Sequence, residues 1–499
     1  MKVRYYQWIL LALFLIVLGS RLFFAFQTPN FDSEAYFNLR QIEHITETGL
    51  PLYYDDLSYG GRTYFFPPFF HYMLAFFNLF LPLSLVGKII PNLLISFLVI
   101  IVYLTAEKIT KRKDAALFAA FISGFIPVLF ARTIYTVSEL TLVVPLVFLA
   151  MYCLMNIQEK RFLYTYLIII LILSLTHAST FFLILGLILY LIISEVEIIK
   201  RNRAETELIL FSTFAFLSIQ ALFYKKAFLM HGVSLIWKNM PLPIIAQHFS
   251  QISILGTITQ IGWLPFFYGL YLMFKYIFKE KNKYIYMYIS LVLPIVILLW
   301  LKWIEPPLGL IFLGATLSIL FSEFYKITWE YFKKTKFSRW KWIFIVVLTT
   351  TFLITSVGPA FYLAKGQLNE VVPSYKIEAL EWLGNRTEEK DIVLGALGEG
   401  HLITYSTKRK NVFDNNFLLI DNAAEILTDV EKIFSSQSRV EAIELLDKYK
   451  VDYIIVSDKV KRDYQIQTLI YRDEDCIKRI YRGEIEIYKN NCKIRTLAI

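Results

Sequence analysis

The chain has 499 residues, of which 57% are hydrophobic and 18% charged, and its formal net charge is +10. With a mean hydropathy of +0.52, this composition is typical of a polytopic membrane protein and argues against a soluble globular enzyme. The charge is uneven: residues 365–499 hold 21 basic and 23 acidic side chains, and the remainder holds 30 and 18. The basic excess follows the apolar part of the chain. It therefore indicates membrane topology and not a nucleic-acid-binding surface.

The first apolar stretch, residues 8–27, is long enough to cross a bilayer and lacks a small-residue cleavage site, so we expect a first span and not a cleaved signal peptide. Ten further apolar segments bring the expected number of spans to eleven. They are residues 87–106, 115–131, 139–157, 162–176, 179–195, 207–223, 254–275, 284–302, 307–325 and 342–363.

Segment 65–85, which contains His71, is apolar but interrupted by prolines. The 13 residues between Pro68 and Pro82 would span only about 20 Å as a helix. If this segment does not cross and the N-terminus is cytoplasmic, the inside segments hold 21 lysines and arginines against 9 outside. A crossing would reverse every later loop against the positive-inside rule. We therefore expect an interfacial or re-entrant segment at the outer face and an extracytoplasmic C-terminus.

The pattern changes after residue 364. We expect a transmembrane domain over 1–364, with an outer loop at 28–86, and a soluble extracytoplasmic α/β domain over 365–499. Its expected helices begin with one capped by Ser374, and its strands include 391–397 and 452–458. Further helices are expected over 421–434 and 439–449, followed by a hairpin about Gly483. Cys476 and Cys492 flank that hairpin and could face each other, but a disulfide also needs an oxidising compartment and suitable geometry, so their pairing stays open.

This topology gathers ionisable residues at the outer ends of the spans, where such residues indicate a functional site. They are Asp32 and Glu34 after the first span, Arg132 and Glu139 between the third and fourth, and His177 between the fifth and sixth. Hard carboxylate oxygens suit Mg²⁺ or Mn²⁺, which bridge phosphate oxygens.

Each residue also has a simpler interpretation. Asp32 and Glu34 could be solvated loop carboxylates, Glu139 could favour a helix N-terminus, and His177 could be a packed histidine. Arg40 and Arg62 could bind phosphate or lie at the lipid headgroups. Asp55 and Asp56 are expected to form a solvated turn.

In their order along the chain, these motifs resemble the GT-C superfamily of membrane glycosyltransferases, and in particular the catalytic subunit of archaeal and bacterial oligosaccharyltransferases. The first outer loop opens with Asp32, followed by Tyr36, Phe37 and Arg40, and FFPPFFHYMLA resembles a proline-aromatic stretch of lipid-phosphate-sugar transferases. Arg132 and Thr133 precede Glu139 as an Arg-Thr pair precedes the family's second acidic motif. The run ALEWLGNRTEEKDIVLGALGEGH resembles the start of the family's outer soluble domain.

The resemblance implies transfer of a glycan from a polyprenyl-phosphate-linked donor to a protein, lipid or glycan acceptor at the extracytoplasmic face, with a divalent cation, Mn²⁺ or Mg²⁺. It implies that Asp32, Glu34 and Glu139 are catalytic and that Asp32 and Glu139 bind the metal. Arg62, Arg132 and His177 are then expected to contact the donor. Glu399 and His401 are expected on the acceptor side.

The sequence departs from the family at three places. Thr141 replaces the second acid of the second motif, and the loop before residue 254 lacks the expected glutamate. The Trp-Trp-Asp-Tyr-Gly motif, which reads the sequon in oligosaccharyltransferases, aligns with Ala396-Leu397-Gly398-Glu399-Gly400, where only the last glycine is shared.

These departures leave alternatives open. A transferase that uses a polyprenyl-monophosphate sugar and a lipid or glycan acceptor is one alternative. A non-catalytic relative is another, and a transporter is a third, although a transporter predicts polar residues near mid-membrane in two repeats.

Overall fold

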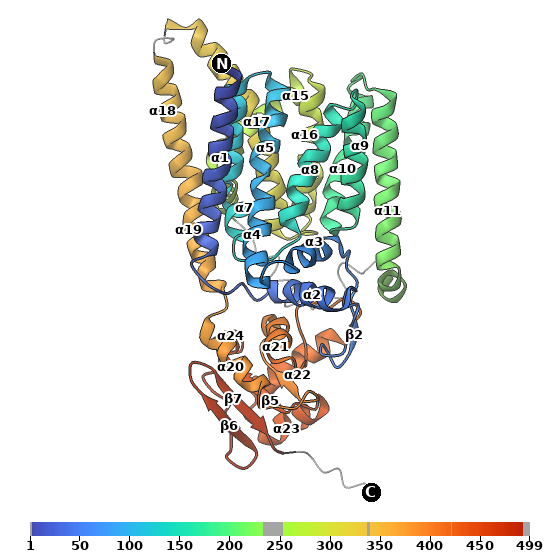
Figure 1. Cartoon of the computed structure of the whole chain (residues 1–499), viewed down its shortest axis with the longest axis vertical. Coiled ribbons are helices and arrows are strands. Elements are labelled where there is room, and N and C mark those ends of the chain that lie inside the picture. The colour runs from blue at the N-terminus through green and yellow to red at the C-terminus, as the bar shows by residue number, and fades with distance from the viewer. Residues whose placement is uncertain (1, 233–252, 337–339, 421, 493–499) are drawn as a thin grey trace. The chain divides into compact units, whose positions relative to one another are not determined.

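Helices make up most of the chain (Figure 1), and several are long and apolar enough to cross a bilayer. The computed structural model describes residues 2–232, 253–336, 340–420 and 422–492. Within these residues, seven helices are long and apolar enough to cross a membrane. They are Tyr5–Ala25, Leu83–Thr110, Ala178–Val196, Arg203–His231, Lys283–Trp300, Pro306–Lys334 and Trp342–Glu370. An eighth candidate is the pair Ile254–Ile261 and Trp263–Phe278, which is bent by 102°.

The remaining three of the eleven expected spans correspond to shorter helices. Residues 115–131 divide into α6 (Lys113–Gly124) and α7 (Pro127–Arg132), because the chain leaves the helix at Phe125 and restarts at a proline. Residues 139–157 and 162–176 form α8 (Leu140–Met155) and α9 (Lys160–Ser174). At 1.5 Å per residue, α6, α8 and α9 reach about 18–24 Å and α7 about 9 Å, all less than the thickness of a bilayer core. Among the described residues, seven or eight helices are therefore long enough by themselves to cross a bilayer.

The proline-flanked segment forms a short helix, α3 (Phe69–Asn78). Its 10 residues rise about 15 Å, which is too short to cross a bilayer. Pro68 precedes the first residue of α3, and the following helix, α4 (Leu83–Ser96), begins directly after Pro82, as expected for a residue that fixes φ and lacks an amide donor.

The chain divides into two compact units, each described here by itself. The helical unit comprises 1–28, 67–223 and 248–369, and the C-terminal unit comprises 29–66, 224–247 and 370–499. The outer loop up to Phe66 thus groups with the C-terminal residues. The other helices of the helical unit are α1 (Lys2–Ala25), α5 (Leu98–Thr110), α10 (Phe181–Val196), α11 (Arg203–His231, whose last residues belong to the C-terminal unit), α14 (Ile254–Ile261), α15 (Trp263–Phe278), α16 (Lys283–Trp300), α17 (Pro306–Lys334), α18 (Lys341–Phe352) and α19 (Gly358–Gln367).

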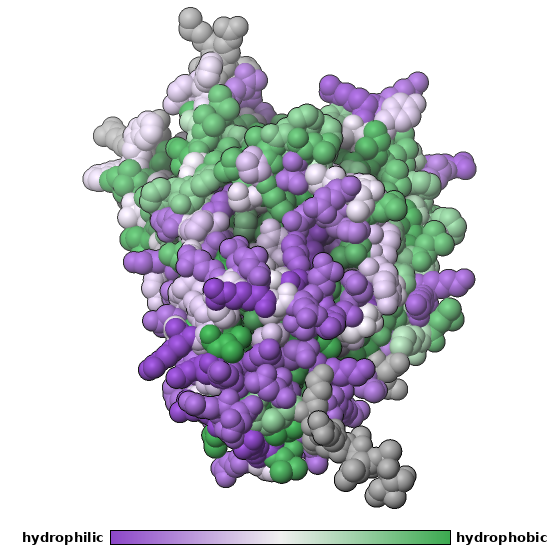
Figure 2. Space-filling model, turned by 60° about the horizontal axis from the view of Figure 1, so that its bottom comes forward, coloured by the Kyte–Doolittle hydropathy of each residue, from purple (hydrophilic) through white to green (hydrophobic). Residues whose placement is uncertain are grey.

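The sides of the helical unit expose large apolar side chains, as a lipid-facing surface requires. On α11, Phe214 is 73% exposed and Leu222 is 78% exposed. Figure 2 shows the green, hydrophobic surface that side chains of this kind make.

The C-terminal unit is built on a five-stranded mixed sheet with the strand order β4-β3-β5-β7-β6. The first three strands in that order are parallel, and β7 and β6 form an antiparallel hairpin beside β5. The strands are β3 (Ile392–Leu394), β4 (Lys410–Asn411), β5 (Tyr453–Val456), β6 (Ile477–Arg482) and β7 (Glu486–Asn490). All four residues of β5 are buried, so it is the apolar centre of the sheet.

The helices of residues 370–492 are α20 (Ser374–Gly384), α21 (Gly400–Thr407), α22 (Ala423–Ser435), α23 (Arg439–Lys448) and α24 (Asp458–Asp463). The predicted bounds of α20, α22 and α23 agree with the structure within two residues, whereas α21 and α24 were not predicted from the sequence. Ser374 is the first residue of α20, whose N-cap position is held by Pro373 without a side-chain bond, so the prediction of Ser374 as a cap is wrong.

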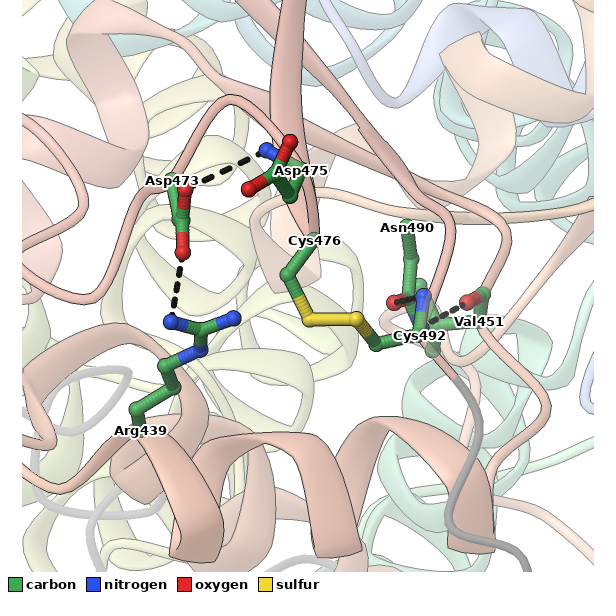
Figure 3. The surroundings of a disulfide bond; sticks show 7 residues. All are labelled: Arg439, Val451, Asp473, Asp475, Cys476, Asn490 and Cys492. Carbon is green, nitrogen blue, oxygen red and sulfur yellow. Dashed lines mark hydrogen bonds and ion pairs between the residues drawn. A yellow bond between two sulfur atoms is a disulfide. The ribbon is translucent and has the colours of Figure 1, made fainter.

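Cys476 and Cys492 are joined in a disulfide, with their Cα atoms 5.0 Å apart (Figure 3). The bond closes the open end of the β6–β7 hairpin. Two further contacts hold this end: Arg439 pairs with Asp473 over 2.5 Å, and the Asn490 amide donates to the Val451 carbonyl. The remaining cysteine, Cys153, is free and buried in the helical unit.

Candidate functional site

Asp32 lies in the C-terminal unit, held between the residues before α20 and the helix α2 (Ala35–Thr48). It forms an isolated antiparallel bridge with Val371, and the amide of Val372 donates to the carbonyl of Phe31 over 2.9 Å. Its carboxylate accepts the amide of Ala35 at 2.9 Å. Asp32 is therefore fixed in backbone and side chain at the start of α2.

Glu34 occupies the N-cap position of the same helix, but its side chain makes no capping bond. Glu34 is exposed, whereas Asp32 is half-buried. The two carboxylates thus differ in environment, and that of Asp32 is held more firmly.

Glu139 lies in the helical unit at the start of α8, where a carboxylate is favoured by the helix dipole. It also has a specific neighbour: Nε2 of His71, on α3, lies 3.6 Å from its Oε1. His71 is fully buried, while the Glu139 side chain is 17% exposed. The proline-aromatic segment therefore brings a histidine to the second acidic motif.

Helix α3 also contacts the chain next to His177. The amide of Phe69, at the start of α3, donates to the carbonyl of Leu175 over 3.0 Å, which brings this turn of α3 to the chain just before His177. The imidazole Nδ1 of His177 accepts the Ser179 amide at 3.1 Å. Arg132, at the end of α7, is exposed.

Arg62 lies in β2 (Arg62–Thr63), which pairs with β1 (Tyr54–Asp55) in the outer loop. Its side chain is 2% exposed, and its guanidinium contacts Asp414 at 3.3 Å. It also donates to the carbonyls of Asn416 and Leu418 and to the Asn416 side chain. A donor phosphate would have to compete with these contacts, so we treat Arg62 below as a residue of the contact between the loop and residues 414–418.

Asp414 is the buried centre of that contact. Its carboxylate accepts the Ser58 hydroxyl at 2.6 Å and the Tyr64 hydroxyl at 3.1 Å, in addition to Arg62. Burial opposes its ionisation, but His401, Arg62 and the Ser58 bond together hold the pKa of Asp414 below its usual value.

His401, expected on the acceptor side, packs its ring against Phe37 and places Nδ1 3.6 Å from Asp414. Burial lowers the pKa of His401, and the nearby Asp414 opposes that shift only in part. His401 is thus a neutral member of the loop contact near pH 7.

Glu399, also expected on the acceptor side, is 2% exposed. One carboxylate oxygen accepts Lys376 Nζ at 2.6 Å, and the other accepts the Ser457 hydroxyl at 2.8 Å. These partners come from α20 and from the end of β5, so Glu399 ties the carboxyl ends of β3 and β5 together.

The expectation that Asp55 lies in a solvated turn is wrong. Asp55 is fully buried and accepts two 2.6 Å bonds from the guanidinium of Arg40, on α2. Asp56, the next residue, is exposed as expected.

Among the described residues, no group of three or more His, Cys, Asp or Glu is arranged to hold a metal ion. The two carboxylates that are expected from the sequence to bind metal lie in different units, Asp32 in the C-terminal unit and Glu139, with the imidazole of His71 beside it, in the helical unit. The loop that lacks the family's glutamate falls on residues 233–252, outside the described residues.

No family model and no curated protein matches this sequence. The structure does match solved structures. The oligosaccharyltransferase of Archaeoglobus fulgidus in its apo form superposes with a TM-score of 0.72 at 14% identity, over 91% of this chain and 70% of that one. The chain has a GT-C fold.

Two further structures with this GT-C fold carry ligands. The archaeal enzyme AglB from the same organism, in complex with an inhibitory peptide and a dolichol-phosphate, has a TM-score of 0.68 at 13% identity, over 90% of this chain and 70% of that one. ArnT from Cupriavidus metallidurans, bound to undecaprenyl phosphate, has a TM-score of 0.54 at 10% identity, over 100% and 99%. The Archaeoglobus enzyme has also been crystallised with zinc and sulfate.

Two residues of the contacts described above were not identified from the sequence, His71 beside Glu139 and Asp414 beside Arg62. His71 was visible as a lone ionisable residue in an apolar segment, which is itself a functional signal in membrane proteins. Asp414 had no such signal, since a single aspartate in a polar stretch of a soluble region is common.

Proposed function

We propose that this protein is a membrane glycosyltransferase that moves a sugar or glycan from a polyprenyl-phosphate-linked donor to an acceptor at the extracytoplasmic face. The observation that carries the proposal is the likeness, over nine-tenths or more of the chain, to two GT-C proteins whose structures contain dolichol-phosphate or undecaprenyl phosphate. A lipid-linked donor also suits a protein whose apolar helices contact lipid, because the donor then reaches the site from the bilayer.

An apolar cavity of about 680 Å³ in the helical unit supports a lipid donor. It lies among α14, α15, α16 and α17, and its lining among the described residues is apolar apart from Thr257 and Lys302. The 102° turn between α14 and α15 opens this space, and Gly262 permits the turn with φ of +101°, which other residues rarely adopt. A polyprenyl tail would lie along the apolar walls with its phosphate near Lys302.

Asp32 and Glu139 are the carboxylates on which we base the chemistry. Carboxylate oxygens are the ligands that Mg²⁺ and Mn²⁺ prefer, and such an ion, when bound, would neutralise the leaving phosphate. His71 would orient Glu139 through its Nε2. Arg132, exposed at the end of α7, and His177 would contact the donor phosphate, and Glu34 would remain a peripheral acid.

The eleven-span arrangement, with a cytoplasmic N-terminus and an extracytoplasmic C-terminus, belongs to this proposal. It requires α8, α9 and the broken α6–α7 segment to cross as short helices, which buried helices in a bundle can do where the bilayer thins. The Cys476–Cys492 disulfide supports an oxidising location for the C-terminal residues.

The acceptor distinguishes two versions of this function. The first is protein glycosylation, as in an oligosaccharyltransferase. The second is transfer from a polyprenyl-monophosphate sugar to a lipid or glycan. The second is favoured by two observations: the chain covers 99% of ArnT but 70% of the archaeal enzyme, and Ala396–Gly400 lack the sequon-reading residues.

The test uses the purified full chain, lipid-linked donor extracted from its own membranes, and either Mn²⁺ or EDTA. A sequon peptide is offered together with lipid acceptors, and glycopeptide is measured against glycolipid. We expect metal-dependent transfer that is lost in Asp32→Ala and in Glu139→Gln. Asp56→Ala is the matched control, because it removes an exposed carboxylate from the same loop.

Glycopeptide would favour the first version and glycolipid the second. If no donor is consumed with any acceptor, or if Asp32→Ala turns over donor like the unchanged protein, the catalytic assignment is overturned. Binding of Mn²⁺, followed by electron paramagnetic resonance (EPR), provides a readout that does not depend on turnover.

A further inference from the structure

Four charges of alternating sign, three of them buried and one half-buried, follow one another in the C-terminal unit. Arg40 on α2 pairs with Asp55 on β1 through two 2.6 Å bonds. Asp55 is the cross-strand partner of Arg62 on β2. Arg62 in turn contacts Asp414 at 3.3 Å. The side chains of Asp55, Arg62 and Asp414 are at most 2% exposed, and that of Arg40 is 13% exposed. We name these four residues the charge ladder.

All four charges of the ladder act electrostatically on the same residue, His401, whose ring packs on Phe37 of α2. Two side-chain ion pairs, Arg40–Asp55 and Arg62–Asp414, are thus connected by the backbone pairing of Asp55 with Arg62, and they lead from Asp414 through the β1–β2 hairpin to α2.

At the other end of this chain of contacts lies Asp32. Helix α2 begins three residues after it, and the Asp32 carboxylate accepts the amide of Ala35. The backbone beside Asp32 is pinned separately by the bridge to Val371. Asp32 is thus held from two sides, by the residues before α20 and by α2, and the orientation of α2 is held by the ladder.

Burying ion pairs is a poor way to gain stability, because the cost of desolvating the charges offsets their attraction. Apolar residues would hold the loop equally firmly. What paired charges add is geometry: the two parallel bonds between Arg40 and Asp55 fix distance and angle together. This is the property that a helix carrying a reactive carboxylate at its start requires.

We propose that the charge ladder Arg40–Asp55–Arg62–Asp414 positions Asp32 for glycosyl transfer. This inference rests on the proposed function for its catalytic consequence, but not for its structural one. The four residues are positioning residues, since none of them needs to touch the donor or the acceptor.

The structural readout is a spin label at Ser33→Cys in the full chain. The introduced thiol is selective, because Cys153 is buried and the other two cysteines are bonded. We expect a single immobilised spectrum in the otherwise unchanged protein. Asp414→Asn and Arg40→Lys should each add a mobile component. Arg40→Lys keeps the charge but loses the paired bonds, so it perturbs geometry with less risk to folding.

The matched control is Asp429→Asn. Asp429 accepts bonds from Lys448 and from Tyr449 in the same unit, away from α2. We expect this variant to leave the label spectrum, the apparent Mn²⁺ affinity and the turnover unchanged. In the ladder variants, kcat should fall at least about tenfold while KM for the donor stays within about twofold, because a shift of about 1 Å in a reacting group has a large effect on rate.

The outcomes are distinguishable. If folded Arg40→Lys and Asp414→Asn keep the immobilised spectrum, the ladder does not position Asp32 and the inference is overturned, whatever the turnover. If the label loosens but the unchanged protein transfers no sugar, the proposed function fails and the structural inference stands. If Asp414→Asn does not fold, Arg40→Lys alone decides.

Discussion

Asp32 and Val371 face each other across an isolated antiparallel bridge, although 339 positions separate them in the sequence. Asn30 strengthens this contact, because its side-chain amide donates to the Val372 carbonyl over 2.9 Å. The first acidic motif therefore enters the same unit as the C-terminal sheet. A change in the residues before α20 can consequently reach Asp32 directly through this bridge.

The glycine shared with the oligosaccharyltransferase motif, Gly400, has a packing reason. A Cβ there would lie 2.2 Å from the Phe413 carbonyl oxygen and 2.6 Å from Asp414 Cβ. We expect Gly400→Ala to displace Asp414 and to destabilise the C-terminal unit by about 1–3 kcal/mol, as overpacking does. Gly398→Ala is the control, since its Cβ would meet chiefly the flexible end of Lys459. Hydrogen exchange of the Asn411 and Asn416 amides measures the difference, and equal exchange in the two variants would refute this explanation.

Loss of His71 should reduce the catalytic contribution of Glu139. His71 Nε2 is the neighbour of Glu139 at 3.6 Å, so His71→Ala removes the group that orients this carboxylate. We expect kcat to fall about 10- to 100-fold, with thermal stability lowered only modestly. Asn78→Ala, near the end of the same helix, is the comparison. A His71→Ala enzyme with unchanged kcat would remove His71 from the candidate site.

The contact between the outer loop and Asp414 should lose stability in acid. The loss should begin near the pH at which His401 takes up a proton in the unfolded state. Burial lowers the pKa of His401 in the folded state, so the unfolded state binds its proton first. Its contribution is complete above the unfolded value of about 6.5 and is lost as the pH falls below it, by up to about 1.4 kcal/mol per pH unit. Asp414, whose folded pKa is also lowered, adds a loss only below about pH 3.9.

The measurement is thermal unfolding of the full chain between pH 7.5 and pH 5, compared with His401→Gln. The variant should lose less stability on acidification than the unchanged protein. The same slope in both would show that His401 does not titrate on unfolding.

Breaking the disulfide should loosen the C-terminal hairpin. Cys476 and Cys492 are 16 residues apart, and closing a loop of about 15 residues is worth about 3 kcal/mol. We expect Cys476→Ser with Cys492→Ser to make the hairpin sensitive to protease at temperatures where the bonded protein resists. Cys153→Ala should not have this effect. In intact cells, alkylation of Cys476 before reduction would argue against an oxidising location for this unit.

The composition of the sequence and the spacing of its apolar residues determined the structural class, a helical membrane protein with a mixed helix-and-strand C-terminal part. Its apolar runs are too long and too many for a soluble core, and the later change to alternating helix and strand patterns placed most elements of the C-terminal sheet within a few residues. The order of Asp32, the proline-aromatic stretch and Glu139 was also sufficient for the resemblance to the GT-C fold, since that resemblance depends on residue types and sidedness along the chain.

The partners of the charged residues were decided only by the tertiary structure. Arg62 and Asp55 are unremarkable in a polar loop, and no local pattern shows that Asp414, some 350 positions away, neutralises Arg62 in a buried site. The span lengths were likewise ambiguous, because hydropathy marks an apolar segment but not the helix break at Phe125 and Pro127. Hydropathy and periodicity are properties of neighbours in sequence, whereas desolvation and ion pairing depend on neighbours in space.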